Sequence, residues 1–331
     1  MHITLPSSLR VVSAAAALLL ALGAAPAAQS ARTTAGSRGT VHPQAIEALA
    51  PAAPAIHLQR YSVWFEVPRD GAGTREIELV ALARPALLAV DIQPARLQAE
   101  PGSLARFSVT LSGRPAFLGG AFTLAFRELA GGTTLGEIPV DVQRGVGGAR
   151  STKEAAYATL EELLAEVRTG VYSMGDRDEA VSKLEHALEE LGESLAPELW
   201  AKDEFGVIDQ NRLNEDEGAD VFHEERECAQ KTFDAIRQGE IDDAGLRAEL
   251  LGLIDTLVFA DRLLAETAIN DALAAGGDAE EIAEAEEHLA EGDALVAAAA
   301  AESDLRTVAA LLYAAMDGEY RHAWKEAVDS H

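Results

Sequence analysis

Two pairs of side chains, each a carboxylate and a histidine, are the clearest candidates for chemistry in this sequence. Asp220 stands three residues before His223, and Glu319 stands three residues before His322. Residues three apart share one face of a helix, and di-iron helical proteins hold their metal with Glu-x-x-His pairs. Such a centre needs two Glu pairs and two more carboxylates, whereas one pair here begins with Asp. A metalloenzyme site is therefore the alternative, and chance pairing in an acidic segment is the favoured interpretation.

A second candidate for metal binding is a run of oxygen donors that the sequence places in a loop. The donors are Asp203, Asp209, Asn211 and Glu215. Hard cations such as Ca²⁺ prefer ligands of this kind. However, Leu213 stands where a calcium loop needs an oxygen ligand, and Asn214 stands where it needs glycine. We therefore favour a solvated acidic loop and predict no cofactor, with Ca²⁺ or another divalent cation as the alternative.

Asp261 interrupts an apolar stripe. It lies between Leu257 and Leu264 at helical spacing, so a helix that buries these leucines buries Asp261 as well. A buried carboxylate needs a cation or several hydrogen-bond donors. We expect a partner from another helix or an indole N–H from Trp200 or Trp324. A structural polar link is favoured over a perturbed acid in a pocket.

The lone cysteine, Cys228, excludes an internal disulfide and any cysteine-rich zinc site. It lies on an apolar helix face, where burial would make the thiol unreactive. His223 is five residues away and on another face, so no nucleophile pair forms. The sequence also lacks a Gly-x-Ser-x-Gly, a phosphate-binding glycine loop and a His-Glu-x-x-His. We predict no catalytic residue and no enzyme.

Charge divides the chain into two parts. Of 27 Lys and Arg and 55 Asp and Glu in 331 residues, residues 151–331 hold 14 and 45. A net charge of −28 excludes nucleic acid and anionic membranes as main partners. The change in charge predicts a domain boundary at a glycine-rich linker, residues 145–150.

The N-terminal region predicts export. Residues 1–31 contain an apolar run and small residues near Ala27, which is typical of a cleaved signal peptide. The run is shorter than the ~20 residues that span a bilayer, so the mature chain is predicted to have no membrane span. Residues 32–58, rich in Ala and Pro, are expected to be a flexible tether, with a short helix at 44–49 as an alternative.

The sequence pattern of residues 59–144 predicts β-strands. Tyr61, Val63, Phe65 and Val67 alternate with other residues, and the same period of two recurs four more times up to Val142. Turn residues lie between these runs, and six or seven short strands at this spacing indicate an antiparallel β-sandwich. The run from Ile92 to Phe107 resembles bacterial immunoglobulin-like modules, without the cysteine pair of antibody domains.

The sequence pattern of residues 151–331 predicts helices throughout this part, and we expect them to form an acidic six-helix bundle. Asp176, Asp278 and Ser303 are expected N-caps, and Gly170, Gly239 and Gly276 are expected at helix ends. Apolar stripes at a spacing of three or four residues lie between these caps. The fold class is therefore a multidomain β and α protein.

Several short motifs of this helical half resemble, in order, a C-terminal helical module of secreted bacterial and archaeal multidomain proteins. They are KLEHA (183–187), SLAPELW (194–200), GADVFHEE (218–225), ADRLLA (260–265), AINDA (268–272) and YRHAW (320–324). The resemblance covers about residues 155–329 and implies an accessory module without catalytic residues. The expected function is a non-enzymatic secreted or cell-envelope scaffold with an unknown extracellular partner. A divalent-cation-binding envelope protein is the alternative.

Overall fold

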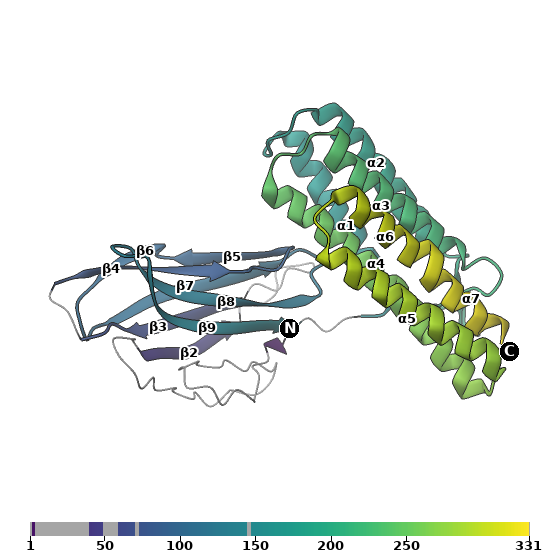
Figure 1. Ribbon diagram of the computed structural model, residues 1–331, viewed down its shortest axis with the longest axis horizontal. Coiled ribbons are helices and arrows are strands. Elements are labelled where there is room, and N and C mark those ends of the chain that lie inside the picture. The colour runs from purple at the N-terminus through teal and green to yellow at the C-terminus, as the bar shows by residue number, and fades with distance from the viewer. Residues whose placement is uncertain (1, 4–39, 49–58, 70–72, 144–146, 331) are drawn as a thin grey trace. The chain divides into compact units, whose positions relative to one another are not determined.

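The computed structural model describes residues 2–3, 40–48, 59–69, 73–143 and 147–330. The chain divides into two compact units, Met1–Gly145 and Val146–His331. Antiparallel sheets make up the first unit and helices dominate the second, so this is a mixed β and α protein (Figure 1). Apart from residues 2–3, the predicted signal peptide and its cleavage site lie outside the described residues.

The strands of the first unit form two antiparallel sheets. In the described ranges they are β1 (His2–Ile3), β2 (Thr40–Ala48), β3 (Gln59–Glu66), β4 (Arg75–Leu82), β5 (Leu88–Gln93), β6 (Arg96–Ala99), β7 (Leu104–Gly113), β8 (Gly119–Glu128) and β9 (Thr133–Gln143). One sheet has the order β1-β9-β8-β4-β6 and the other β2-β3-β7-β5. Strands β3, β4, β7, β8 and β9 confirm the five predicted runs, and with β5 and β6 the number of strands from 59 to 143 agrees with the predicted six or seven. Period-two alternation buries one face of a strand, as at Phe107 and Val109 of β7.

Aromatic side chains join the two sheets. The ring of Phe126 from β8 stacks on Phe65 from β3, with centroids 4.6 Å apart. It also meets Phe107 from β7 edge to face at 5.8 Å. Because β8 belongs to one sheet and β3 and β7 to the other, these rings form a core between the sheets. All three residues are fully buried.

The predicted tether, residues 32–58, needs a correction at its centre. Thr40–Ala48 forms strand β2, which pairs antiparallel with β3 from Thr40 opposite Glu66 to Ala48 opposite Gln59. The alternative of a short helix at 44–49 is also wrong. The edge of β3 that does not pair with β7 offers backbone N–H and C=O groups to β2. Amino-acid composition does not reveal this pairing. Pro43 is compatible with β2 because this strand lies at the edge of its sheet.

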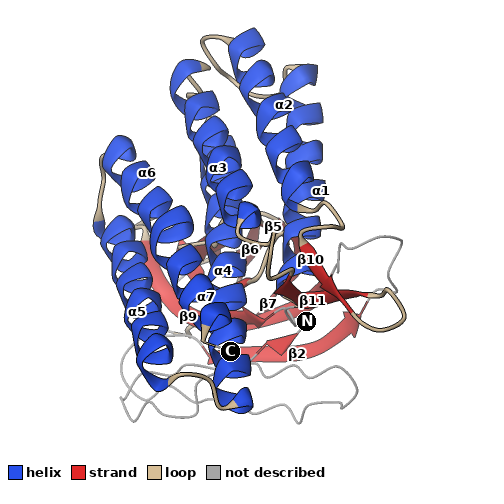
Figure 2. Cartoon of the chain, turned by 90° about the vertical axis from the view of Figure 1, so that its right-hand side faces the viewer, coloured by secondary structure: helices blue, strands red, loops and turns tan. Residues whose placement is uncertain are grey.

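The second unit contains six helical rods in its described residues, as predicted. The helices are α1 (Ala149–Thr169), α2 (Arg177–Ser194), α3 (Asp220–Gln238), α4 (Ala244–Ala275), α5 (Ala279–Ala301), and a continuous last rod of α6 (Leu305–Tyr313), the π-helix η1 (Ala314–Tyr320) and α7 (Arg321–Asp329). They lie alongside one another (Figure 2). A membrane-spanning helix needs ~20 apolar residues, and no helix of the described chain offers such a stretch.

The helix ends follow the expected capping chemistry with one exception. Asp176 and Asp278 accept backbone N–H groups in the first turns of α2 and α5, as predicted. Gly170 and Gly276 end α1 and α4 in the left-handed region, at φ 79° and 78°. The N-cap of α6 is Asp304 rather than Ser303, because the Asp304 carboxylate accepts the N–H of Thr307.

A β-hairpin corrects the prediction that the second unit is helical throughout. Strands β10 (Trp200–Lys202) and β11 (Ile208–Leu213) pair antiparallel. The side chain of Asn211 accepts the N–H of Ala149 at 2.8 Å and so holds the start of α1. A Cβ atom at Gly148 would lie 2.6 Å from the same Asn211 oxygen, which requires glycine there. The hairpin is thus part of the helical unit's packing.

Helix α5 approaches η1 closely at one glycine. A Cβ atom at Gly292 would lie 2.4 Å from Cε1 of the buried Tyr320 ring. The hydroxyl of Tyr320 donates to Oδ1 of Asp293 at 3.0 Å, which fixes the ring against α5. This contact sets the spacing and register of the two helices.

We predict that Gly292→Ala lowers the free energy of unfolding by ~1–3 kcal/mol, because the added methyl group overpacks the site. Gly318→Ala in η1 is the matched control, since a Cβ there meets nothing within 4 Å. The control should be neutral or gain up to ~1 kcal/mol from helix propensity. Urea unfolding of both variants decides, and equal stabilities would show that the Tyr320 ring does not lie against Gly292.

Candidate functional site

Three charged side chains meet in the interior of the helical unit. The ammonium of Lys153, from α1, donates to Oδ1 of Asp261, from α4, at 2.8 Å. It also donates to Oε1 of Glu225, from α3. All three side chains are 0% exposed. The predicted burial of Asp261 and its partner on another helix are confirmed, whereas the Trp200 indole donates to the carbonyl of Ser194 instead.

The buried environment raises the pKa values of two members of this triad, Asp261 and Lys153. Burial raises the pKa of the Asp261 carboxyl well above its ordinary value, and the negative charge of Glu225 adds to this. Burial by itself would lower the pKa of Lys153, but the charges of Asp261 and Glu225 outweigh it and the pKa rises. The two carboxyl groups therefore favour the charged form of Lys153, whereas burial disfavours the charged form of Asp261.

Cys228 lies on α3 and is fully buried, as predicted. Burial raises the pKa of its thiol far above the ordinary value, and the charge of Glu225 acts in the same direction. A thiol of this kind is a poor nucleophile because the thiolate is not formed at neutral pH.

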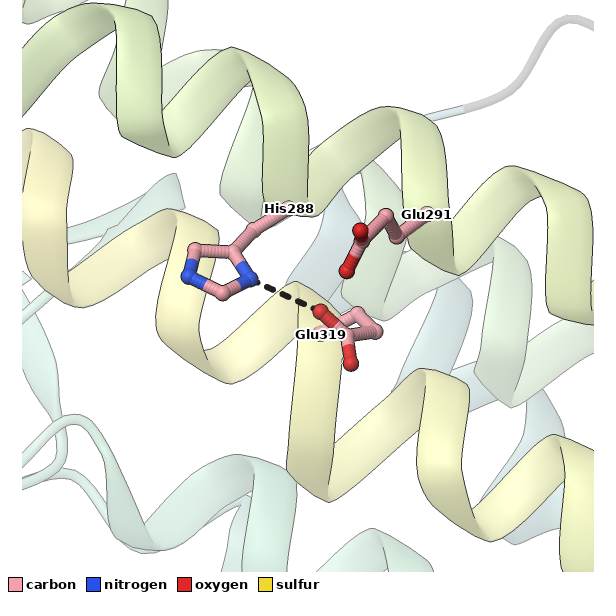
Figure 3. A group of neighbouring side chains, drawn as sticks. All are labelled: His288, Glu291 and Glu319. Carbon is pink, nitrogen blue, oxygen red and sulfur yellow. Dashed lines mark hydrogen bonds and ion pairs between the residues drawn. The ribbon is translucent and has the colours of Figure 1, made fainter.

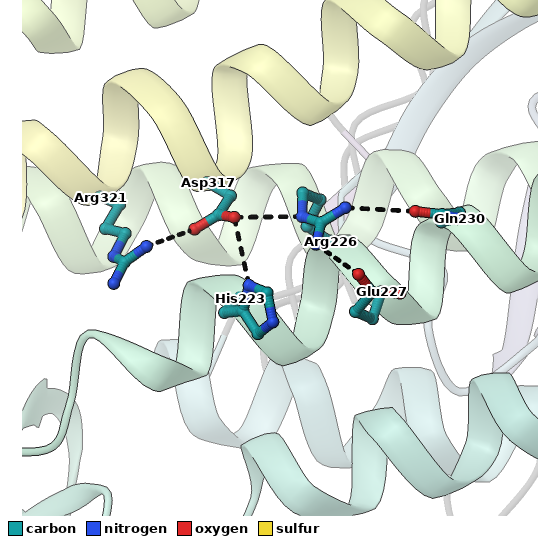
Figure 4. A network of polar contacts seen from close by, with 6 residues as sticks. All are labelled: His223, Arg226, Glu227, Gln230, Asp317 and Arg321. Atoms are coloured by element: carbon teal, nitrogen blue, oxygen red, sulfur yellow. Dashed lines mark hydrogen bonds and ion pairs between the residues drawn. The ribbon is translucent and has the colours of Figure 1, made fainter.

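The first predicted pair does not act as a unit. Asp220 is exposed at the start of α3, whereas Nδ1 of His223 lies 3.3 Å from Oδ2 of Asp317 in η1. Asp317 also accepts from Arg226 at 3.0 Å and from Arg321 at 2.9 Å (Figure 4). This carboxylate therefore joins the last helical rod to α3 through Arg226 and His223, while Arg321 contacts it from the same rod.

The second predicted pair faces another helix. Oε2 of Glu319 lies 2.7 Å from Nδ1 of His288 in α5. The ring of His322 is 5.3 Å from the ring of His288. In the described chain, no group of three potential metal ligands contains Asp220, His223 or His322. The metalloenzyme alternative would need Asp220, His223, Glu319 and His322 to converge, whereas His223 contacts Asp317, which faces α3, and Glu319 faces α5.

The acidic residues expected in a loop instead build the hairpin. Asp203 accepts the N–H groups of Phe205 and Val207 at 2.9 and 2.8 Å and closes its turn. Asp209 accepts the N–H groups of Asn211 and Arg212 at 2.8 and 3.1 Å. Glu215 is exposed beyond the hairpin. The described side chains of this segment form no three-ligand metal group, since their oxygens bind backbone.

A carboxylate cluster joins α2 to α3. The ligand oxygens of Glu190, Glu193 and Glu224 lie within 4.8 Å of one another. Burial raises the pKa of Glu224 to about 7, and its hydrogen bond to Glu190 and the nearby negative charges add to this. Glu224 is therefore partly protonated at neutral pH.

The sequence contained a signal for two residues that its interpretation missed. Lys153 falls on the stripe of Ala156, Leu160 and Val167, and Glu225 falls among Phe222, Ala229 and Phe233. Each interrupts an apolar stripe as Asp261 does. His288 and Glu291, three residues apart on α5, show only the spacing of a shared helix face.

Comparison of the chain with protein-family models and with curated proteins finds no match. The resemblance of residues 155–329 to an accessory module therefore remains a hypothesis based on sequence motifs. Functional interpretation depends on the geometry of the chain's own residues.

We predict that Lys153→Met destabilises the protein by ~3–5 kcal/mol, because it leaves two buried carboxyl groups without their cation. Lys183→Met on α2 is the matched control; Lys183 pairs with Glu179 at 3.3 Å at the surface and should cost under ~1 kcal/mol. Asp261→Asn should cost less than Lys153→Met, since it leaves the Lys153 ammonium paired with Glu225. Chemical denaturation measures all three, and equal losses from the two lysine variants would refute the buried triad.

A second prediction concerns pH. The folded-state pKa of Glu224, about 7, lies above the ordinary 4.5. Between pH 4.5 and about 7, the folded state therefore binds more protons at Glu224 than the unfolded state does. The contribution of Glu224 to the free energy of unfolding consequently falls as the pH rises through this range. When the pH is raised from 5 to 8, the free energy of unfolding should fall less in the Glu224→Gln variant than in the wild type. Exposed Glu189→Gln is the control, and parallel pH profiles for wild type and Glu224→Gln would contradict the prediction.

Proposed function

We propose that this chain is an exported, non-enzymatic interaction or scaffold protein of the cell envelope or extracellular space. Residues 1–31 would direct export, with cleavage near Ala27. The first unit would be an immunoglobulin-like sandwich, with Phe126 between its two sheets, and the second an acidic six-helix bundle. The resemblance of residues 155–329 to accessory modules of secreted proteins supports this proposal.

The observation that carries the proposal is the burial of the reactive groups. Lys153, Asp261 and Cys228 are each 0% exposed. Groups with strongly shifted pKa values are the usual candidates for catalysis. Here no substrate could reach them without opening the helical packing. The contact of Lys153 with Asp261 favours a structural role for these two residues.

A groove on the helical unit offers a surface for a partner. It has a volume of about 720 Å³ and lies between α3, the start of α4 and α6. The rings of Phe233 and Tyr313, 5.8 Å apart, supply apolar surface. Arg237, Arg247 and Arg306 line the same groove and provide hydrogen-bond donors in an otherwise acidic unit. Asp234, Glu240, Asp242 and Asp304 line the groove as well, and Arg237 pairs with Asp234. This combination suits a partner segment with apolar side chains and polar groups of both charges.

Divalent-cation binding is the second candidate function. His288, Glu291 and Glu319 favour it, because their ligand atoms lie within 4.8 Å of one another. A carboxylate and histidine metalloenzyme is less well supported. It would need Asp220, His223, Glu319 and His322 at one ion, and their contacts divide between two neighbouring helices.

The proposal is tested with fluorescently labelled residues 32–331 and cell envelopes of the native host. Saturable binding is expected. Ala310→Trp should abolish it, because Ala310 is exposed in the groove. Ala274→Trp, at an exposed position of α4 outside the groove, should bind as the wild type does. Absence of saturable binding, or equal binding by both variants, would overturn the proposed interaction site.

A further inference from the structure

Helix α5 and the last helical rod bring four potential ligands together. His288 and Glu291 lie three residues apart on α5, and Glu319 and His322 lie three residues apart where η1 passes into α7. The close contact of Gly292 with the Tyr320 ring holds α5 against η1 next to these residues. Both pairs therefore belong to rigid helices, which suits a preorganised site.

The side chains point toward one another. Nδ1 of His288 is 2.7 Å from Oε2 of Glu319, and Glu291 approaches the same point from α5 (Figure 3). The ligand atoms of these three residues lie within 4.8 Å of one another. The His322 ring adds a second imidazole, with its centroid 5.3 Å from that of His288.

We propose that His288, Glu291, Glu319 and His322 bind a divalent transition-metal ion, of which Zn²⁺ is the representative. Zn²⁺ lies about 2.0–2.2 Å from nitrogen and oxygen ligands. Donors on one ion are then about 3–3.5 Å apart. The ligand atoms of His288, Glu291 and Glu319 already lie within 4.8 Å of one another, and the His322 side chain must rotate to join them. Two carboxylates would balance the ion's charge, and two imidazoles would complete four-coordinate geometry.

The donor set also selects among cations. Ca²⁺ and Mg²⁺ prefer oxygen ligands, whereas imidazole favours Zn²⁺, Cu²⁺ and Ni²⁺. The cluster of Glu190, Glu193 and Glu224 offers oxygen alone and carries no such inference. Glu291 and His322 are exposed, so an ion can enter from solvent. The π-helical turn at Glu319 is consistent with a binding role, because π-helices are frequent at functional sites.

This inference rests on the second candidate function and is independent of the groove. The test is calorimetric titration of metal-free full chain, without a histidine tag, with ZnCl₂. We expect one Zn²⁺ per chain and a loss of affinity of about tenfold or more in His288→Ala and in Glu319→Gln. His186→Ala, an exposed histidine of α2, is the matched control and should bind as the wild type does.

A second readout separates binding from folding. Co²⁺ in place of Zn²⁺ should give a visible absorption band that is lost in His288→Ala. Should that variant fail to fold by circular dichroism, exposed His322→Ala replaces it. The proposal is overturned if Zn²⁺ does not bind below millimolar concentration, or if wild type and the folded ligand variant bind it equally. Binding of Ca²⁺ in preference to Zn²⁺ would also overturn it. Envelope binding by the Ala310→Trp variant tests the groove separately.

Discussion

Lys153 places an ammonium group among the apolar side chains of three helices, where an unpaired charge would cost several kcal/mol. Glu225 and Asp261 meet it from α3 and α4, so α1 can keep its leucines buried only while all three helices hold one register. Rotation of any of these helices would separate a charge from its partner. The apolar core supplies most of the stabilisation, but it tolerates sliding better than this contact does. The ionic contact therefore selects one arrangement of the helices.

The same burial bears on function. Shifted pKa values are common where a protein performs chemistry, yet here Lys153, Asp261 and Cys228 are closed off from solvent, whereas Glu224 is partly accessible. The accessible features of the helical unit are different in kind: a groove with aromatic and arginine side chains, and histidines and carboxylates on the surface of α5 and the last rod. The proposed interaction role and the proposed cation site would both use these accessible residues.

Periodicity in the sequence was sufficient for most of the architecture, because burial of one face controls the pattern of strands and helices alike. It indicated Asp261 as a buried polar residue, and the same argument applied to α1 and α3 would have found Lys153 and Glu225. It missed β2, because the partner strand rather than composition makes Thr40–Ala48 extended. It singled out Asp220 with His223 and Glu319 with His322, but spacing along one helix does not reveal the partners on neighbouring helices, Asp317 for His223 and His288 for Glu319. The meeting of His288 with Glu319 depends on the approach of Gly292 to Tyr320, which is a tertiary contact.

The hairpin that holds the start of α1 has a mechanical consequence. A tension applied along the chain from the first unit enters the helical unit at Gly148 and Ala149. There the Asn211 side chain accepts a hydrogen bond from the backbone N–H of Ala149 in α1. The neighbouring Arg212 forms a bidentate ion pair with Asp271 of α4, in which its Nε and Nη2 lie 2.6 and 2.9 Å from the two carboxylate oxygens. The applied force is thus distributed over α1 and α4 before the first turn of α1 can unwind. A protein anchored at one end and held by a partner at the other would resist extension at this junction.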